Sequence, residues 1–360
     1  MNFWQNLKNN RGNKLEKNPT GQGRPLMVLA PMADVTDAAF RRIIAKYGKP
    51  DVLWTEFVAA DGLVKADAKG KARLMRDLVF DESERPIVAQ FFTSNPEHMQ
   101  QVAELAVELG FDGIDINMGC PDKSIEKQSA GAALMKDPAR ARALIRAAKE
   151  GVKEAIERGG KNIPVSVKTR VGFNKVELET WLPELLAEQP AVITLHARTR
   201  KEMSKVPARW EHVKRAVEIR DEVQSTLPEK ERTLIFGNGD VTDLADAEKK
   251  AHETGCDGVM FGRAIFGNPW LFAPLGLSRS PFGKKSREEI SLKDRLAVMV
   301  EHSRLFEKLL GDVKNFAVMK KHYKAYVTGF DGAKELREKL MACNDVEEVA
   351  AAVNAFCRAL

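Results

Sequence analysis

The 360-residue chain has few cysteines, few aromatic residues and no long hydrophobic run. Its four cysteines are scattered without a Cys-x-x-Cys pair, so a disulfide framework and a thiolate metal site are both disfavoured. No run approaches the roughly 18 apolar residues that a membrane span requires. Residues 1–24 lack the apolar segment of a signal peptide. We therefore expect a cytoplasmic protein without a metal site or a membrane segment.

The charge of the chain is concentrated near its two ends. The formal net charge is +6, of which residues 1–24 carry +4. Residues 281–330 hold 11 basic and 6 acidic side chains, whereas residues 25–280 carry a net charge of −1. This distribution predicts a neutral body with a basic N-terminal arm, residues 1–24, and a basic region near the C-terminus. Such a pattern is compatible with a polyanionic partner.

Short apolar runs alternate with amphipathic stretches from Pro25 onward. Buried parallel strands are typically short runs rich in β-branched residues. Eight runs fit that description: Leu26–Ala30, Val52–Phe57, Ile87–Phe92, Gly113–Asn117, Val165–Lys168, Ala191–Leu195, Thr233–Phe236 and Gly258–Phe261. Helical periodicity lies between them, for example over Pro96–Leu109, Pro138–Arg158 and Asp243–Thr254, the last with Thr242 or Asp243 as its N-cap.

Eight alternations over about 240 residues favour a closed (β/α)8 TIM barrel. A doubly wound sheet is the alternative, but no GxGxxG follows a first strand. The pattern changes at Gly276–Lys285, which is typical of a linker. The following helical stretches are Ser291–Leu310, Val313–Thr328, Lys334–Met341 and Val346–Leu360. We therefore predict a barrel over residues 25–275 and a small helical domain over residues 286–360.

Polar or reactive side chains follow most of the predicted strands. In a barrel these positions share the carboxyl-terminal rim, where active sites form. A lysine at Lys168 could stabilise negative charge on a reduced flavin, and a strand-end lysine with a purely structural role is the alternative. Glycine turns after the seventh and eighth strands resemble a barrel phosphate site, although they could simply be turns. The rim positions are Pro31, Met32, Gln90, Asn117, Cys120, Lys168, Arg170, His196, Asn238, Gly239, Asp240, Gly262 and Arg263.

The thiol of Cys120 lies in a Gly-Cys-Pro turn, where it could act as a general acid. A packed loop cysteine is the structural alternative. His196 could likewise be a strand-end histidine without a catalytic role.

These motifs resemble those of the tRNA-dihydrouridine synthases. The resemblance is carried by Leu29–Asp37, Pro86–Gln90, Gly113–Pro121, Val167–Arg170, His196–Thr199, Gly237–Asp240, Gly262–Arg263 and Gly267–Phe272, and by Lys320–Tyr326 in the tail. It spans residues from about Pro25 to Leu340. Several positions depart from the common family pattern: Asp34 and Ala197 stand where glycine is usual, and Phe92–Ser94 differs from the more frequent stretch after Gln90.

The resemblance implies an FMN-dependent reduction of uridine in tRNA. NADPH or NADH would reduce FMN, the flavin would pass a hydride to C6 of the uracil, and Cys120 would protonate C5. Asn117 and Arg170 would contact the substrate. The expected FMN contacts are Pro31, Met32, Ala33, Gln90, Lys168, His196, Asn238, Gly239, Asp240, Gly262 and Arg263.

Basic residues in the tail favour a tRNA substrate over a free pyrimidine. Lys314, Lys320, Lys321 and Lys324 are predicted to lie on one side of a helix that contacts phosphates. A solvated basic face is the alternative. Two other functions stay open: an FMN barrel enzyme like dihydroorotate dehydrogenase, and a tRNA-binding barrel without catalysis. We expect a monomer whose partners are tRNA and NAD(P)H.

Overall fold

The computed structural model describes residues 3–4, 6–7 and 24–359. Within them eight parallel strands form one sheet in the order β1-β8-β7-β6-β5-β4-β3-β2. The strands are β1 (Leu26–Leu29), β2 (Leu53–Ala59), β3 (Ile87–Phe92), β4 (Gly113–Asn117), β5 (Val165–Arg170), β6 (Val192–His196), β7 (Leu234–Asn238) and β8 (Gly258–Phe261).

The two ends of this sheet meet between β1 and β2. A parallel bridge joins Val28 to Val52. The amide of Asp51 donates to the carbonyl of Met27 at 2.8 Å, and that of Leu29 donates to the carbonyl of Val52 at 3.3 Å. With the sheet joined around its whole circumference, the predicted (β/α)8 barrel is confirmed.

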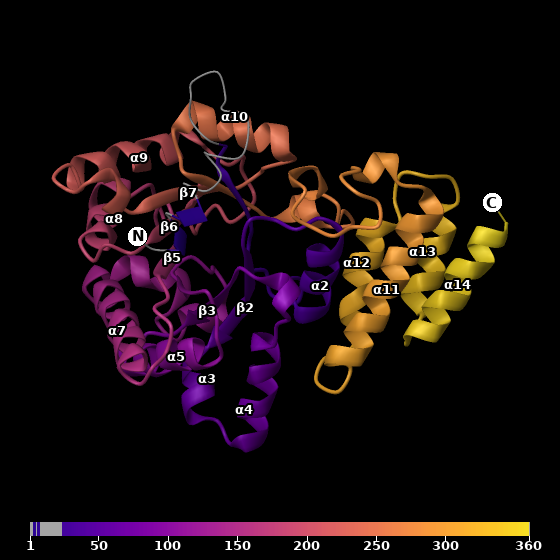
Figure 1. Cartoon of the computed structure of the whole chain (residues 1–360), viewed down its shortest axis with the longest axis horizontal. Helices are drawn as coiled ribbons and strands as arrows, with labels where there is room; N and C mark the ends of the chain where they lie inside the picture. The colour runs from indigo at the N-terminus through magenta and orange to yellow at the C-terminus, as the bar shows by residue number, and fades with distance from the viewer. Residues whose placement is uncertain (1–2, 5, 8–23, 360) are drawn as a thin grey trace.

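Helices follow the strands and cover the outside of the barrel (Figure 1). A second group of helices, at the C-terminal end, lies to one side of the barrel next to α2 (Figure 1). The helices of the barrel part are α2 (Ala38–Tyr47), α3 (Ala60–Lys65), α4 (Ala68–Met75), α5 (Pro96–Glu108), α6 (Lys123–Glu126), α7 (Pro138–Glu157), α8 (Leu178–Leu186), α9 (Glu211–Val223) and α10 (Leu244–Thr254). Those of the C-terminal group are α11 (Leu292–Leu310), α12 (Met319–Tyr326), α13 (Ala333–Ala342) and α14 (Val346–Arg358).

Side-chain caps determine where several of these helices begin. Asn95 accepts from the amide of Glu97 at 2.9 Å, and Asp137 accepts from the amide of Arg140 at 3.1 Å. In both helices proline occupies the first turn, where no amide hydrogen is needed. Asp243 caps α10, which decides between the two residues that the sequence offers for this position.

The amino-terminal half of the barrel interior is apolar, because the first inward-facing residues of several strands form one buried cluster. Trp4 completes the cluster. Its ring stacks on that of Trp54 with the centroids 5.5 Å apart, and it meets the ring of Phe236 edge to face with the centroids 5.6 Å apart. Trp4 therefore belongs to the barrel core rather than to an exposed arm. Arg24, at the other end of the predicted arm, pairs with Asp51 at 2.8 Å. The basic residues between them lie outside the described residues.

The C-terminal helices have a hydrophobic core of their own, which also takes in Ala39 of α2. The contact with the barrel contains three rings. The ring centroid of Phe40 lies 4.9 Å from those of both His302, on which it stacks, and His322, to which it is tilted. A barrel helix and two C-terminal helices therefore share one buried interface.

The helix predicted over Val313–Thr328 is shorter than expected. Asn315 accepts from the amide of Ala317 at 2.8 Å and starts a single 3-10 turn, and α12 begins only at Met319. Lys314 precedes both, so it does not lie on the helix, and its ammonium group is paired with carboxylates of the barrel part. Its ammonium group contacts Glu56 at 2.7 Å and Asp77 at 2.9 Å. The prediction that Lys314 belongs to that face is therefore wrong.

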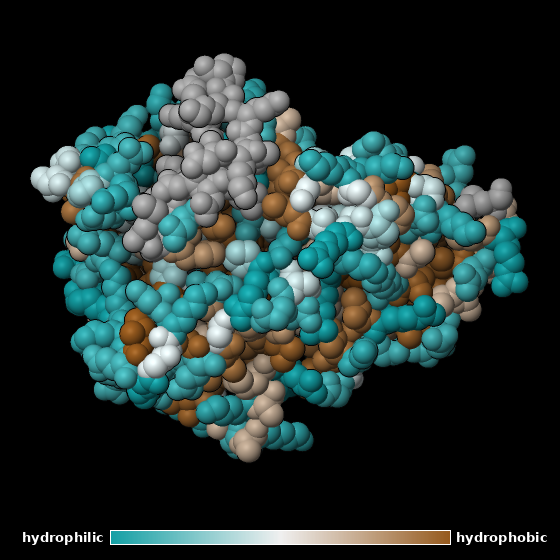
Figure 2. All heavy atoms as spheres, viewed as in Figure 1, coloured by the Kyte–Doolittle hydropathy of each residue, from teal (hydrophilic) through white to brown (hydrophobic). Residues whose placement is uncertain are grey.

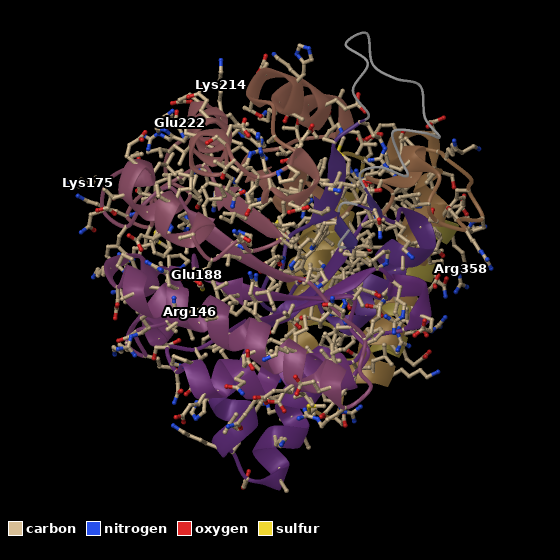
Figure 3. All side chains as sticks on the ribbon, turned by 60° about the vertical axis from the view of Figure 1, so that its left-hand side comes forward. Arg146, Lys175, Glu188, Lys214, Glu222 and Arg358 are labelled. Carbon is tan, nitrogen blue, oxygen red and sulfur yellow. The ribbon has the colours of Figure 1, made fainter. Side chains whose placement is uncertain are left out.

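The outer surface carries many ion pairs between neighbouring helices. Arg146 of α7 lies 2.6 Å from Glu188, just after α8, and the two lie close together in Figure 3. The face of the molecule in Figure 2 is mostly hydrophilic. Among the described helices none has the length and apolar character needed to span a bilayer.

Candidate active site

The predicted rim residues come together at the carboxyl ends of the strands. The strand register places Asn117 beside Lys168 and His196 beside Asn238. Strands β5, β6 and β7 run further than the sequence pattern indicates, so Arg170, His196 and Asn238 are the last residues of their strands. These three residues are therefore positioned by the sheet itself rather than by the loops that follow it.

Three side chains from β3 and β4 form a buried hydrogen-bond chain. The Nε2 of Gln90 donates to Oδ2 of Asp115 at 2.5 Å, and Nδ2 of Asn117 donates to Oε1 of Gln90 at 3.1 Å. Oδ1 of Asn117 accepts from the amides of Gly119 and Cys120, at 3.1 and 2.9 Å. The chain connects the barrel interior to the loop that carries the thiol.

Lys168 lies in the upper part of the barrel interior, where its Nζ donates to Oδ1 of Asn238 at 3.3 Å. Nδ2 of Asn238 donates to the carbonyl of Met260 at 2.7 Å, which fixes the orientation of this amide. Burial, with Arg170 nearby, lowers the pKa of Lys168 to about 8. The pKa of Lys168 is thus close to neutral pH, and pKa values shifted in this way are common at functional sites.

The thiol of Cys120 is half-buried and packs near Phe92, Ile125 and Ala130. Burial raises the pKa of this thiol above its usual value. Cys120 therefore keeps its proton at neutral pH, which is the state that a general acid requires. Its backbone is fixed on both sides, because its amide donates to Asn117 and its carbonyl accepts from Ala132 at 2.9 Å.

His196 is neutral in this site. Burial and the nearby cations Arg170, Lys168 and Arg198 lower its pKa well below the usual value. Nη1 of Arg198 lies 3.2 Å from Nε2 of His196. Because a guanidinium group can only donate, Nε2 is the acceptor and Nδ1 carries the proton.

The turns after β7 and β8 contain the glycines predicted for phosphate binding. Gly239 has a φ of +125°, a conformation that L side chains rarely adopt, and a Cβ there would lie 3.1 Å from the ring of His196. A Cβ on Gly262 would meet nothing within 4 Å. Asp240 accepts from Arg263 at 2.8 Å and also pairs with Arg198. In the structure the Asp240 carboxylate thus orients two arginines.

The loop after β1 provides the remaining rim residues. Pro31 is buried, Met32 is half-buried and Ala33 is exposed, so the loop opens progressively toward solvent. Asp34 has a φ of +53°, a left-handed conformation that favours glycine and that aspartate tolerates. A glycine would adopt this conformation without strain.

The predicted substrate residues have different surroundings. Arg170 is buried and donates to the carbonyls of Gly119 at 2.7 Å and Thr199 at 3.2 Å, so its guanidinium connects the loops that follow β4 and β6. Lys320, Lys321 and Lys324 lie on α12 of the C-terminal group rather than on a barrel strand. Lys321 is 3.9 Å from Asp34 of the barrel, whereas no described carboxylate pairs with Lys320 or Lys324.

Several residues of the site were not predicted individually from the sequence. Asp115 looked like part of an ordinary strand, and Arg198 was noted at the end of a strand and in the His196–Thr199 motif without a role of its own. The signal for Asp115 was strand alternation, since it is two residues before Asn117 and must face the same side. Within the described part of the chain, no group of three or more His, Cys, Asp or Glu side chains is placed to hold a metal ion.

Comparison with known proteins places this chain in a family. The family model described as dihydrouridine synthase (Dus) matches residues 28–360. "Probable tRNA-dihydrouridine synthase 2" of Bacillus subtilis is 38% identical over 93% of this chain and 95% of its own length. "Probable tRNA-dihydrouridine synthase" of Staphylococcus aureus is 36% identical over 92% of this chain and 93% of its own length.

Among solved structures, histamine dehydrogenase from Rhizobium sp. 4-9 matches with a TM-score of 0.51 and 12% identity, covering 83% of this chain and 51% of that chain. This likeness concerns the fold alone. The family model and the two relatives each cover nearly the whole chain, and the family model includes all the residues of the rim. The chain therefore belongs to the dihydrouridine synthase family.

Proposed function

We propose that this protein reduces uridine in tRNA to 5,6-dihydrouridine, with FMN as bound cofactor and NADPH or NADH as reductant. One observation carries the proposal within the family: the protonated thiol of Cys120, on the loop after β4, and the titratable ammonium group of Lys168, on the neighbouring strand β5, lie at the same end of the barrel. Such a pair supplies a proton donor and a cation, which the reduction of a C=C bond next to a carbonyl group needs.

The rim residues fit a flavin nucleotide. Gly262 leaves open space above β8, and Arg263 beside it has a 67% exposed side chain that can reach a phosphate. Inside the barrel the hydroxyl of Thr194 is buried without a partner, next to Lys168 in the strand register. A polar ring edge placed there satisfies both groups. The expected cofactor contacts at Pro31, Met32, Ala33, Gln90, His196, Asn238, Gly239 and Asp240 come from strands or from the loops that directly follow them, which supports this placement.

When bound, FMN supplies to C6 of the uracil the hydride that it has taken from the nicotinamide. Asn117 lies beside the Cys120 loop and presents its amide to the uracil edge. The Sγ–H of Cys120 then gives its proton to C5, and the thiolate regains a proton from solvent. Lys168 stabilises the negative charge that develops, because it is a buried cation at the rim.

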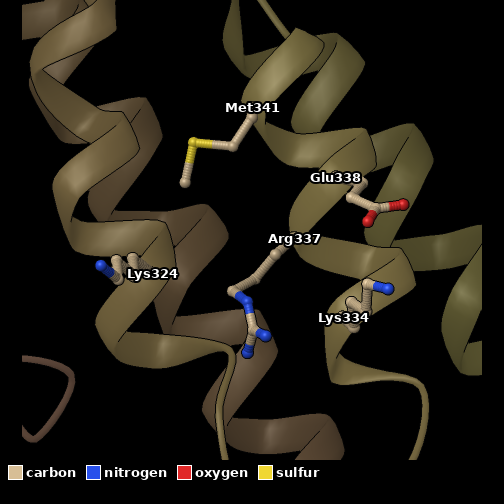
Figure 4. Close-up of a pocket in the computed structure, with 5 residues that line it drawn as sticks. All are labelled: Lys324, Lys334, Arg337, Glu338 and Met341. Carbon is tan, nitrogen blue, oxygen red and sulfur yellow. The ribbon is translucent and has the colours of Figure 1, made fainter.

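We place the tRNA backbone on the basic surface of α12 and α13. Lys320 and Lys324 are free of carboxylate partners among the described residues, and Lys324 lines a hollow of about 450 Å³ with Lys334, Arg337, Glu338 and Met341 (Figure 4). Arg337 is held there, since its Nη1 donates to the carbonyl of Val327 at 2.7 Å. Phosphates are the natural ligands of such a surface.

The target uracil must leave its stack to reach Cys120, as in other enzymes that modify a base. In this proposal the basic helices hold the tRNA body while one base enters the barrel. The protein is expected to work as a cytoplasmic monomer, in the compartment that supplies tRNA and NAD(P)H.

A direct assay tests this function. Purified protein is mixed with FMN, NADPH and an unmodified tRNA transcript, and nucleosides are analysed by mass spectrometry. We expect dihydrouridine in the transcript and oxidation of an equivalent amount of NADPH. Reduction of a free pyrimidine without any reaction on tRNA favours the dihydroorotate dehydrogenase-like alternative. Binding of tRNA without any reduction favours the non-catalytic alternative.

A further inference from the structure

Asp115 is the buried end of the hydrogen-bond chain that leads to Cys120. Its side chain is 1% exposed, and its two oxygens accept from different donors. The hydroxyl of Ser166 donates to Oδ1 at 2.6 Å, and Nε2 of Gln90 donates to Oδ2 at 2.5 Å. Neither the family comparison nor the proposed chemistry assigns Asp115 a role.

The groups at the two ends of the chain, backbone donors outside and a carboxylate acceptor inside, together fix the direction of every hydrogen bond in it. The amides of Gly119 and Cys120 can only donate, so Asn117 must turn Oδ1 toward them. Its Nδ2 then faces Gln90, which must answer with Oε1. This leaves Nε2 of Gln90 pointing inward, where only an acceptor fits.

We infer that Asp115 is a positioning residue for uridine reduction: as an obligatory acceptor it fixes the orientations of the Gln90 and Asn117 amides, and through them the loop that carries Cys120. The inference rests on the proposed function and deepens it. It assigns Asp115 no contact with cofactor or substrate.

The ionisation of Asp115 agrees with this role. Burial raises its pKa to about 6, against hydrogen bonds from Ser166 and Gln90 and the charge of Lys168, which lower it. At neutral pH the group is therefore a carboxylate. On protonation, its hydrogen can turn only toward Ser166, whose hydroxyl then donates to the carbonyl of Ile114 at 3.1 Å. The Gln90 side keeps its acceptor in both states.

Ser166 gives the inference a specific test. In Asp115→Asn the new amide can offer oxygen to Gln90 and N–H to Ser166, whose hydroxyl reverses. Adding Ser166→Ala leaves that N–H buried without a partner, so the new amide is no longer held by hydrogen bonds on both sides. Asp115→Leu removes the acceptor completely and leaves a buried N–H of Gln90 unsatisfied.

The experiment separates the two half-reactions. Holoenzyme is reduced anaerobically with dithionite and mixed with tRNA transcript in a single turnover, and flavin reduction by NADPH is measured separately. We expect Asp115→Leu to slow the tRNA half-reaction by about 10- to 100-fold and the NADPH half-reaction by less than about threefold. Asp115→Asn and Ser166→Ala each lose about threefold in the tRNA half-reaction, and the double variant falls to the level of Asp115→Leu.

Three results overturn the inference: a tRNA half-reaction of Asp115→Leu within threefold of wild type, an equal loss in both half-reactions, or additive losses in the double variant. If Asp115→Leu does not retain flavin, the comparison of Asp115→Asn with the double variant decides alone, because those changes conserve volume. A wild-type enzyme that makes no dihydrouridine refutes the proposed function itself, and the inference with it.

Discussion

The guanidinium group of Arg198 lies 3.2 Å from Nε2 of His196 and at the same time pairs with Asp240. This contact joins the ends of β6 and β7, and it determines which ring nitrogen of His196 carries the proton. The rim therefore presents a neutral imidazole with its Nδ1–H as donor. Such a donor can bind a cofactor oxygen without adding a third cation next to Lys168 and Arg170.

His196 is predicted to stay neutral at pH 6.5 and above, because burial and nearby cations lower its pKa. Nitrogen-15 NMR of labelled protein will show the Nδ1–H tautomer without titration in this range. In Arg198→Met the constraint on Nε2 is lost, and we expect both tautomers to be populated. An imidazolium signal in the wild-type protein at neutral pH contradicts this assignment.

The rate of flavin reduction by NADPH is expected to fall as the pH rises above about 8. The pKa of Lys168 is lowered to about 8, so its positive charge is present below that pH and is lost above it. In Lys168→Arg the charge persists at higher pH, and the alkaline fall should disappear. An identical alkaline limb in both proteins assigns the titration to another group.

Replacing Cys120 with alanine should separate the two halves of the reaction. The variant keeps flavin and oxidises NADPH, because the thiol is not needed for either, but it forms dihydrouridine at least about 100-fold more slowly. Cys256→Ala is the matched control, since Cys256 is buried away from the rim. Undiminished dihydrouridine from Cys120→Ala removes this residue as the acid.

Lys320 and Lys324 are predicted to contact tRNA phosphates. Their joint replacement by alanine should weaken tRNA binding and reduce the slope of log K against log salt by about 0.7–0.9 for each lost contact. Lys321→Ala should have a smaller effect, because Asp34 lies 3.9 Å away. Lys230→Ala, an exposed lysine at the opposite end of the barrel, is the control. Unchanged affinity and slope exclude the α12 surface as the docking site.

Lys314 should matter for stability rather than for phosphate contact. Its ammonium group lies 2.7 Å from Glu56, which is 4% exposed, so its removal leaves a buried carboxylate unpaired. Lys314→Ala is expected to lower the free energy of unfolding by about 3–5 kcal/mol. Lys308→Ala, on the exposed surface of α11, should change it by less than about 0.5 kcal/mol. Equal effects in urea denaturation contradict the ion-pair explanation.

The sequence was sufficient for the fold and for most of the rim. Apolar runs located all eight strands, because strands covered on both faces leave a continuous signal. Which basic residues form ion pairs could not be predicted, since a charge pattern does not show which lysine meets a carboxylate from another element. Lys314 joins a barrel strand more than 250 positions away, and Trp4 enters the barrel core from a segment that looked like a polar arm.

In the site, too, some residues could be found from the sequence and others only from the structure. Cys120, Lys168 and His196 lie at or just after the ends of predicted strands and became candidates from that position, whereas their roles came from the family resemblance. Asp115 and Arg198 act through hydrogen bonds to other strands, and such contacts become visible only when the register is known.

The central claim is that this barrel reduces tRNA uridine with Cys120 as the acid. The most direct measurement is a single turnover of dithionite-reduced holoenzyme with a tRNA transcript, comparing wild type with Cys120→Ala and quantifying dihydrouridine by mass spectrometry. We predict about one dihydrouridine per reduced flavin in the wild type and almost none in the variant over the same time. Equal yields from both proteins, or no dihydrouridine from the wild type, would contradict it.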